Sequence, residues 1–133
     1  MIKKLLVVCT IAVILFSCNG GSTSNPVTDT DVATAFIRAA LDNDFKTAEK
    51  YLLPDEINKQ YLETFQRRAK DPAELEKYKA ADIIINEIKT VSDTVHIVDY
   101  SNSYKKDERT KLKLSWVGGK WLVDFKYTFD EHK

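Results

Sequence analysis

The 133-residue chain has little cysteine, and the positions of its two thiols limit its chemistry. Cys9 and Cys18 both lie near the N-terminus, so no cysteine beyond residue 18 is available for a disulfide, a thiolate metal site or a nucleophile. The sequence also lacks a glycine-rich phosphate loop and the GxSxG and HExxH motifs. With only two histidines, the chain gives no basis for a metal site or a cofactor.

An excess of charge of either sign is also missing. The chain has 20 basic and 20 acidic side chains, and loss of Lys3 and Lys4 with an N-terminal signal would leave a slight negative balance. A nucleic-acid partner requires a basic surface, and attachment to anionic lipid through charge requires a cluster of cations. The composition therefore argues against both partners.

The apolar run at residues 5–16 is too short to span a membrane. About 12 residues at ~1.5 Å each give ~18 Å, whereas the hydrocarbon core of a bilayer is ~30 Å thick. Lys3 and Lys4 precede the run, and positive charge followed by a short apolar stretch is typical of a secretory signal. We therefore expect residues 1–17 to be a cleaved signal peptide.

The end of this run, Leu15-Phe16-Ser17-Cys18, resembles the lipobox of bacterial lipoproteins. That family has an aliphatic residue three positions before the cysteine and a small residue directly before it, so Leu15 and Ser17 fill the signal-recognition positions. The resemblance implies that Cys18 receives a diacylglyceryl group, becomes the first residue of the mature chain and is acylated on its amine. Two or more acyl chains give stable anchoring in a bilayer.

Residues 18–28 are mostly small, polar and uncharged, which predicts a flexible lipidated tether before a single domain at residues 29–133. Asn19 stands where some Gram-negative lipoproteins carry an aspartate that resembles an inner-membrane retention signal. The resemblance therefore implies a protein of the bacterial cell envelope, anchored in the outer membrane and facing the periplasm.

Helical periodicity dominates the first half of the domain. Thr28 and Asp31 have the spacing of a capping box, and apolar residues then recur on one helix face. Asn43, which tolerates a left-handed conformation, is expected to end this helix. Three further helix starts are predicted, at Asp44, Pro54 and Asp71.

The apolar pattern becomes typical of strands after Ala81. Four strands are predicted, at residues 83–91, 94–104, 109–117 and 120–127. Gly118 and Gly119 supply the two positive-φ positions of a type I′ turn, which fixes the register of the last two strands. Val117 opposes Lys120 beside the turn, and the register predicts an apolar face against the helices with the pairs Trp116–Trp121, Leu114–Val123, Leu112–Phe125 and Thr110–Tyr127. The other face, toward water, pairs Lys113 with Asp124 and Lys111 with Lys126.

Helices followed by an antiparallel sheet predict an α+β fold, with N-terminal helices packed on a curved sheet of about four strands. The segments AFIRAALDNDFKTAEKYL and LKLSWVGGKWLVDF resemble the cone-shaped fold of nuclear transport factor two and its relatives. More narrowly, the chain is similar to a family of small bacterial lipoproteins of unknown function with that fold. A cystatin-like domain, with a helix on a sheet, is the competing architecture.

Polar residues on the first predicted hairpin suggest a pocket. With a turn at Ser92 and Asp93, Ile88 opposes Ile97, and Asn86 opposes Asp99 on the same face. Enzymes of the resembled fold include steroid isomerases and dehydratases, in which an aspartate is the general base and a tyrosine stabilises an oxyanion. The candidate pocket residues are Asn86, Asp99, Tyr61, Tyr100 and His96.

The sequence assigns no catalytic set to these residues. His96 and Asp99 lie three apart on a strand and so face opposite sides, which excludes a His–Asp dyad within a regular strand. We therefore expect a non-catalytic binding or interaction module for a small ligand or an envelope protein, whose sheet face could also form an oligomer. A small isomerase- or dehydratase-like enzyme with Asp99 as its pocket carboxylate is the alternative.

The substitution Cys18→Ser removes the sulfur that the lipobox resemblance assigns to acylation. We expect this variant to be soluble or to remain an uncleaved precursor, because the anchoring acyl chains are lost. Membrane fractionation and mass spectrometry of the N-terminus measure the result. Cys9→Ser is the matched control, and normal anchoring of Cys18→Ser would contradict lipidation.

Overall fold

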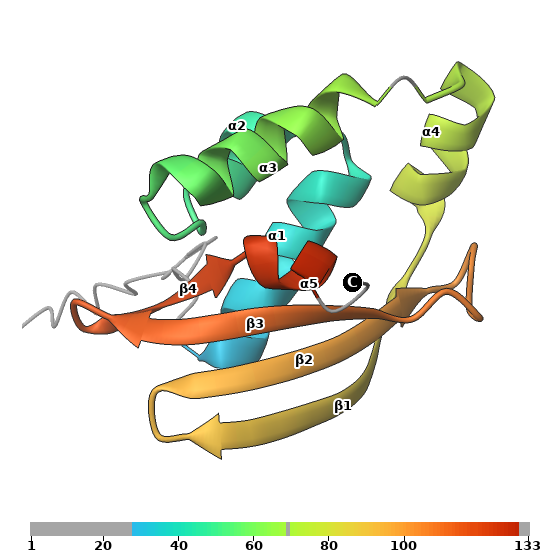
Figure 1. Ribbon diagram of the computed structural model, residues 1–133. Helices are drawn as coiled ribbons and strands as arrows, with labels where there is room; N and C mark the ends of the chain where they lie inside the picture. The colour runs from blue at the N-terminus through green and yellow to red at the C-terminus, as the bar shows by residue number, and fades with distance from the viewer. Residues whose placement is uncertain (1–27, 69, 131–133) are drawn as a thin grey trace, which may run out of the picture.

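The computed structural model describes residues 28–68 and 70–130 (Figure 1). The predicted signal peptide, with Leu15 and Ser17, and the predicted acylation site Cys18 lie outside the described residues. Within them, no helix is both long and apolar enough to cross a membrane. The elements run in the order α1 (Asp29–Leu41), α2 (Phe45–Glu49), α3 (Glu56–Arg67), α4 (Pro72–Ala80), β1 (Ile83–Ser92), β2 (Val95–Asn102), β3 (Thr110–Val117), β4 (Lys120–Asp124) and α5 (Lys126–Asp130).

Helix α1 begins at the predicted capping box. The amide of Asp31 donates to Thr28 Oγ1 (3.1 Å), and the amide of Thr28 donates to the Asp31 carboxylate (3.3 Å). After the helix ends, Asn43 adopts a φ of 60°, which confirms the predicted left-handed residue. Phe36 and Ile37 are each 1% exposed, so one face of α1 is fully buried in the core.

The next three helices begin at or within two residues of the predicted starts, although Asp71 makes no side-chain capping hydrogen bond at α4. The Asp44 carboxylate accepts from the amide of Thr47 at the start of α2, and Asp55, directly after Pro54, caps α3 in the same way. Helix α4 has Pro72 in its first turn, where the missing amide proton costs nothing.

Helix α4 buries none of its residues, and a side chain from α1 holds its end. The Arg38 guanidinium donates to the carbonyl of Ala81 (2.8 Å) and to the carbonyls of Tyr78 and Lys79 (3.2 Å each). Carbonyls at the end of a helix have few intrahelical partners, so Arg38 adds hydrogen bonds there beside the one from the amide of Ala81 to the carbonyl of Tyr78 (3.2 Å), and it links α1 to the junction between α4 and β1.

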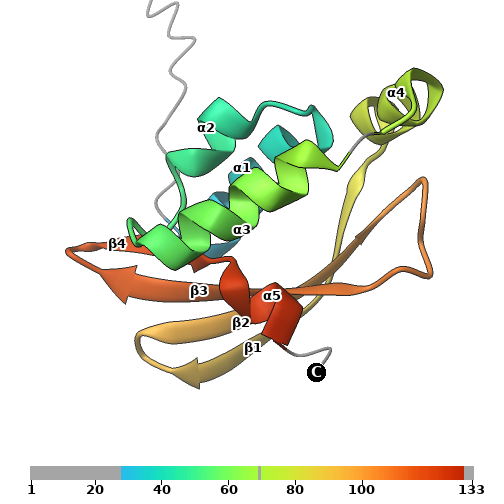
Figure 2. The same cartoon turned by 45° about the horizontal axis from the view of Figure 1, so that its top comes forward.

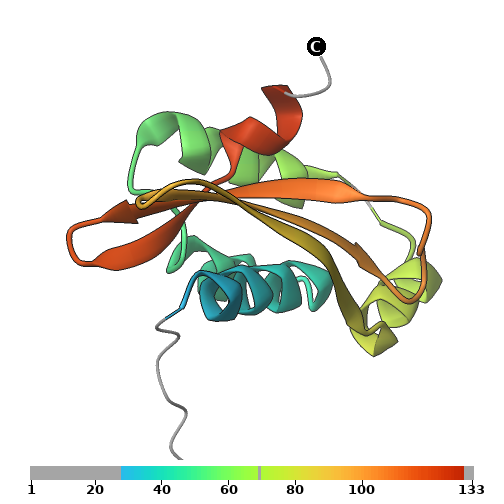
Figure 3. The same cartoon turned by 90° about the horizontal axis from the view of Figure 1, so that it is seen from below.

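The four strands form one antiparallel sheet in the order β1-β2-β3-β4. The outer edge of β4 is covered, because Val123 makes two backbone hydrogen bonds with residues 51–53 (2.8 and 2.9 Å). Strand β1 forms the other edge. Helix α1 packs across one face of the sheet, and the short helix α5 lies on the opposite face (Figures 2 and 3).

The last hairpin has the predicted turn and register near its tip. Gly118 and Gly119 have φ values of 60° and 81°, and Trp116 pairs with Trp121. The prediction of a strand as far as Tyr127 is wrong, since β4 ends at Asp124 and α5 follows. The predicted pairs Leu112–Phe125 and Thr110–Tyr127 therefore do not form. Phe125 and Phe129 lie one helical turn apart and pack edge to face at 5.1 Å, which favours the helix.

The predicted register of the first hairpin is wrong by one residue over residues 87–90, whereas residues 83–85 have the partners that it implies. The turn lies at residues 93–94, and two β-bulges interrupt the pairing between β1 and β2. Ile88 therefore opposes Val98 rather than Ile97, and Glu87 rather than Asn86 opposes Asp99. A one-residue change moves a side chain to the other face of the sheet, so Ile88 leaves the face that carries Asp99.

The core lies between α1 and the sheet and centres on one aromatic ring. The ring of Phe125 contacts Phe36 of α1, Phe65 of α3 and Phe129 of α5, with centroid distances of 5.1–5.9 Å. The predicted core position of the tryptophans is only partly correct, because Trp116 is 42% exposed whereas Trp121 packs against the core.

The substitution Gly119→Val should destabilise the domain by about 1–2 kcal/mol, because a β-branched residue is strained at a positive φ. Apart from the glycine and its two chain neighbours, no heavy atom lies within 4 Å of the position that a Cβ would occupy, so the effect would come from the backbone alone. Thermal unfolding measures it as a lower Tm. Gly118→Asn is the control, since asparagine suits this turn, and equal Tm values for both variants would contradict the assignment.

Candidate functional site

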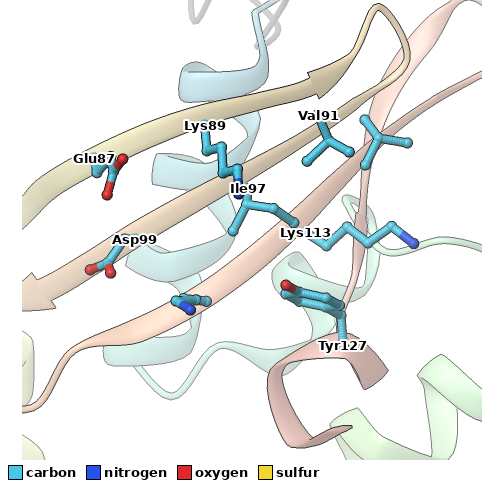
Figure 4. Close-up of a pocket in the computed structure, with 9 residues that line it drawn as sticks. Glu87, Lys89, Val91, Ile97, Asp99, Lys113 and Tyr127 are labelled. Carbon is cyan, nitrogen blue, oxygen red and sulfur yellow. The ribbon is translucent and has the colours of Figure 1, made fainter. Parts of the chain in front are cut away.

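An open groove of about 480 Å³ lies on the face of the sheet opposite α1 (Figure 4). Its floor consists of Val95 and Ile97 from β2, and Val91 from the end of β1 extends it toward the turn. Tyr127 of α5 forms a wall across β3. The groove is therefore built from three strands and the helix that replaces the end of the predicted fourth strand.

Alternation along β2 decides which residues reach the groove. Val95, Ile97 and Asp99 face it, whereas His96 and Val98 face the helices. Val98 is fully buried, and Ile97 is 9% exposed beneath the groove. The strand thus supplies a packed core on one side and an apolar floor with one carboxylate on the other.

Two carboxylates, those of Glu87 and Asp99, lie at one end of the groove (Figure 4). The Asp99 carboxylate accepts from Arg109 Nε at 2.9 Å and from Asn86 Nδ2 at 3.1 Å. The hydrogen bond from Arg109 is the main reason why the pKa of Asp99 lies below its ordinary value, and the Asn86 bond adds to it against the opposing effect of burial. Asp99 is therefore a fixed anion that accepts hydrogen bonds, and a lowered pKa makes it a weak general base.

Three lysines, Lys89, Lys111 and Lys113, line the rest of the groove. The Lys113 ammonium forms an ion pair with Asp124 (3.2 Å) and lies 6.0 Å from the centroid of the Tyr127 ring. The carbonyl of Lys111 accepts from the Thr128 hydroxyl (2.8 Å), which fastens α5 to β3. Because Arg109 already compensates Asp99, the groove keeps a small excess of positive charge around an apolar floor.

The structure brings together only two of the five sequence-predicted pocket residues. Asn86 is the extra residue of a β-bulge, and its amide reaches Asp99 and, at 3.4 Å, the hydroxyl of Ser101. The two side chains meet although they are not register partners. Asp99 lines the groove, and Asn86, which does not line it, holds the Asp99 carboxylate through its amide hydrogen bond.

The other three predicted residues lie away from the groove. The ring of Tyr61 stacks on Phe129 at 4.9 Å, between α3 and α5. Burial raises the pKa of Tyr100 to about 12, and a hydrogen bond with Thr110 opposes that shift. Asp99 and Tyr100 are neighbours on β2 and face opposite sides, so they do not form the base and oxyanion donor of the expected enzyme pocket.

His96 instead forms a pair with the first residue of α1. Its Nδ1 lies 2.6 Å from Asp29 Oδ2, and its ring lies 4.5 Å from the ring of Trp121. Sequence reasoning excluded a partner for His96 on its own strand and missed one 67 positions away. Only the packing of α1 on the sheet creates this pair.

Of the nine residues that line the groove, sequence reasoning named only Asp99 as a pocket residue, and Tyr127 and Lys113 are among those that it missed. A signal for Tyr127 exists in the spacing of Phe125 and Phe129, because helical geometry turns the residue between them away from the core. Lys113 was predicted to pair with Asp124, which is confirmed, but its place on a groove depends on α5. For residues 28–68 and 70–130, no three His, Cys, Asp or Glu side chains are grouped so as to hold a metal ion.

Comparison with known proteins supports the architecture. No protein-family model matches the chain, and no curated protein sequence does. The chain is similar in structure to an NTF-2-like protein of unknown function from Shewanella oneidensis MR-1, with 13% sequence identity and a TM-score of 0.50. The match covers 71% of this chain and 89% of that protein. It shows that the chain has an NTF-2-like α+β fold, as the sequence predicted.

The ion pair between Arg109 and Asp99 predicts a specific pH dependence. The pKa of Asp99 is lower in the folded chain than its ordinary value of 3.8, so the pair stabilises the fold above that pH and loses its effect as the pH falls through the folded-state pKa. Arg109→Gln should raise the pKa of Asp99 and lower the stability at pH 7 only slightly, since Arg109 is largely exposed and solvent screens the pair.

Carbon-13 NMR titration of the Asp99 carboxyl measures this change, and denaturant unfolding at pH 7 and pH 2 measures its effect on stability. Arg67→Gln, at an exposed position on α3, is the matched control. An unchanged Asp99 titration in Arg109→Gln would contradict the assigned cause.

Proposed function

We propose that this chain is a lipid-anchored binding module of the bacterial envelope, which holds an amphipathic ligand in the groove of its sheet. The single observation that carries the binding role is the open groove of about 480 Å³ above Ile97, with lysines and Tyr127 around it. A concave apolar surface with a few polar groups is the usual form of a ligand site. The opposite face of the sheet is packed against α1 and provides the rigid support.

The lipid anchor rests on the sequence alone. Leu15 and Ser17 occupy the recognition positions before Cys18, and a basic, apolar signal precedes them. Anchoring at Cys18 would place the groove within a short chain length of the outer membrane, facing the periplasm. The ligand would then be a molecule or a protein segment of that compartment.

The groove favours a ligand with an apolar body and an acidic group. Val91, Val95 and Ile97 offer aliphatic contact, and Lys89 is an exposed cation at the border. Glu87 and Asp99 repel an anion at the far end, so the acidic group of the ligand would lie toward the lysines. Catalysis by Asp99 is not favoured, because its lowered pKa makes it a weak general base and Tyr100, the expected oxyanion donor, faces the other side of the sheet.

Binding of 8-anilinonaphthalene-1-sulfonate, an apolar probe with one anionic group, tests the groove. The mature chain with Ser in place of Cys18 should bind the probe with amide shifts at Val95, Ile97 and Tyr127 in nitrogen-15 NMR spectra. Lys89→Glu should weaken binding by about fivefold, which corresponds to ~1 kcal/mol for one exposed charge.

Lys106→Glu is the matched control, because it makes the same change in net charge at an exposed position in the turn between β2 and β3. Its affinity for the probe should stay near that of the parent chain. Shifts confined to other surfaces, or equal losses in both variants, would argue against the groove as the binding site.

A further inference from the structure

Exposed apolar side chains gather at one end of the sheet. Val91 is 58% exposed, Trp116 42% and Val117 46%. They belong to the two hairpin turns, which lie side by side because the amide of Trp116 donates to the carbonyl of Thr94 (2.8 Å; Figures 1 and 3). We call residues 91–94 and 116–120 the hairpin end.

Both faces of the hairpin end are apolar. Trp116 extends on the side of α1, whereas Val117 and Val91 extend on the side of the groove. Charge is sparse and balanced there, with Asp93 in one turn and Lys120 in the other. Turns exposed to water usually carry polar residues, so a cluster of large apolar side chains at this place indicates a contact surface.

A chain of contacts connects this surface with the beginning of the domain. Trp116 packs edge to face on Trp121 (5.5 Å), Trp121 lies against His96 (4.5 Å), and His96 pairs with Asp29 (2.6 Å). Asp29 is the first residue of α1. The hairpin end and the start of the domain are therefore at the same end of the molecule.

The length of chain before α1 limits the distance between the domain and the membrane to which Cys18 is expected to be anchored. Residues 19–28 connect the expected acylation site Cys18 to the capping residue of α1. A fully extended segment of that length reaches about 35 Å at most. Acyl chains on Cys18 would hold the lipid surface within this reach of Asp29, and hence close to the hairpin end.

We infer that the hairpin end contacts the lipid bilayer to which the chain is anchored, with Trp116 and Val117 in the interfacial region; this inference rests on the lipid anchor of the proposed function. Tryptophan suits that region because its ring is apolar and its indole nitrogen donates a hydrogen bond to water or to headgroups. The balanced charge of Asp93 and Lys120 fits a zwitterionic surface. The contact orients the domain, with the turn between β2 and β3 away from the membrane.

Site-directed spin labelling of the acylated chain tests the contact, because the mature chain would have no other free thiol. The label is placed at Val117→Cys, and the matched control is Asp107→Cys, an exposed position in the turn between β2 and β3. Both proteins are reconstituted in phosphatidylcholine vesicles after mass spectrometry has checked acylation of Cys18. Collision with oxygen, relative to a water-soluble nickel complex, reports the depth of each label.

The expected result is a ratio of oxygen to nickel accessibility several times higher for residue 117 than for residue 107, together with blue-shifted emission from Trp116 in a Trp121→Phe chain. Labels that are equally exposed to water on an acylated, vesicle-bound chain would overturn the contact and leave the anchor intact. Dipolar broadening between labels at residue 117 would identify a second copy as the occupant and also overturn it. Absence of acylation would overturn the anchor and the contact together.

Discussion

The buried pair of Asn58 and Asp124 determines how the end of the chain meets the rest of the fold. Asn58 is fully buried; its Nδ2 donates to Asp124 (3.0 Å), and its Oδ1 accepts from the amide of Lys126 (2.8 Å). Burial acts to raise the pKa of Asp124, but hydrogen bonds from Lys126, Asn58 and Lys113 outweigh it, so the carboxyl has a lowered pKa. A buried charge without such partners would be costly.

This network connects α3, β4 and the start of α5, and it makes the chain leave the sheet after Asp124. Phe125 then enters the core, and Tyr127 stands over the groove.

Much of the fold could be predicted because its signals are local. The caps at Thr28 and Asp44, the left-handed Asn43 and the turn at Gly118 and Gly119 each depend on a few neighbouring residues. The end of β4 was not predictable from alternation, because Phe125 and Tyr127 continue the apolar pattern of a strand. A helix replaces the strand there through contacts with Asn58, which lies 66 positions before Asp124.

The candidate site was less predictable than the fold. Asn86 and Asp99 were grouped through a register that is wrong at this point. They meet because Asn86 is the bulged residue next to Glu87, and Glu87 is the residue that pairs with Asp99. Bulges change the face of each later residue and leave no clear mark in a single sequence. Arg109, whose hydrogen bond lowers the pKa of Asp99, is ten positions away, on the far side of the turn between β2 and β3.

The weak attachment of α4 has a consequence for the motions of the domain. The helix buries no residue, and it is linked to the body by the hydrogen bonds from Arg38, the edge-to-face contact between Tyr78 and Tyr104, the ion pair of Glu74 with Lys105 (3.5 Å) and cation–ring contacts of nearby lysines. Segments with little buried apolar surface open without global unfolding. The amides of α4 should therefore exchange with solvent deuterium through local opening, earlier than those of α1, and breakage of the Arg38 contacts would loosen α4 while the start of β1 stays paired with β2.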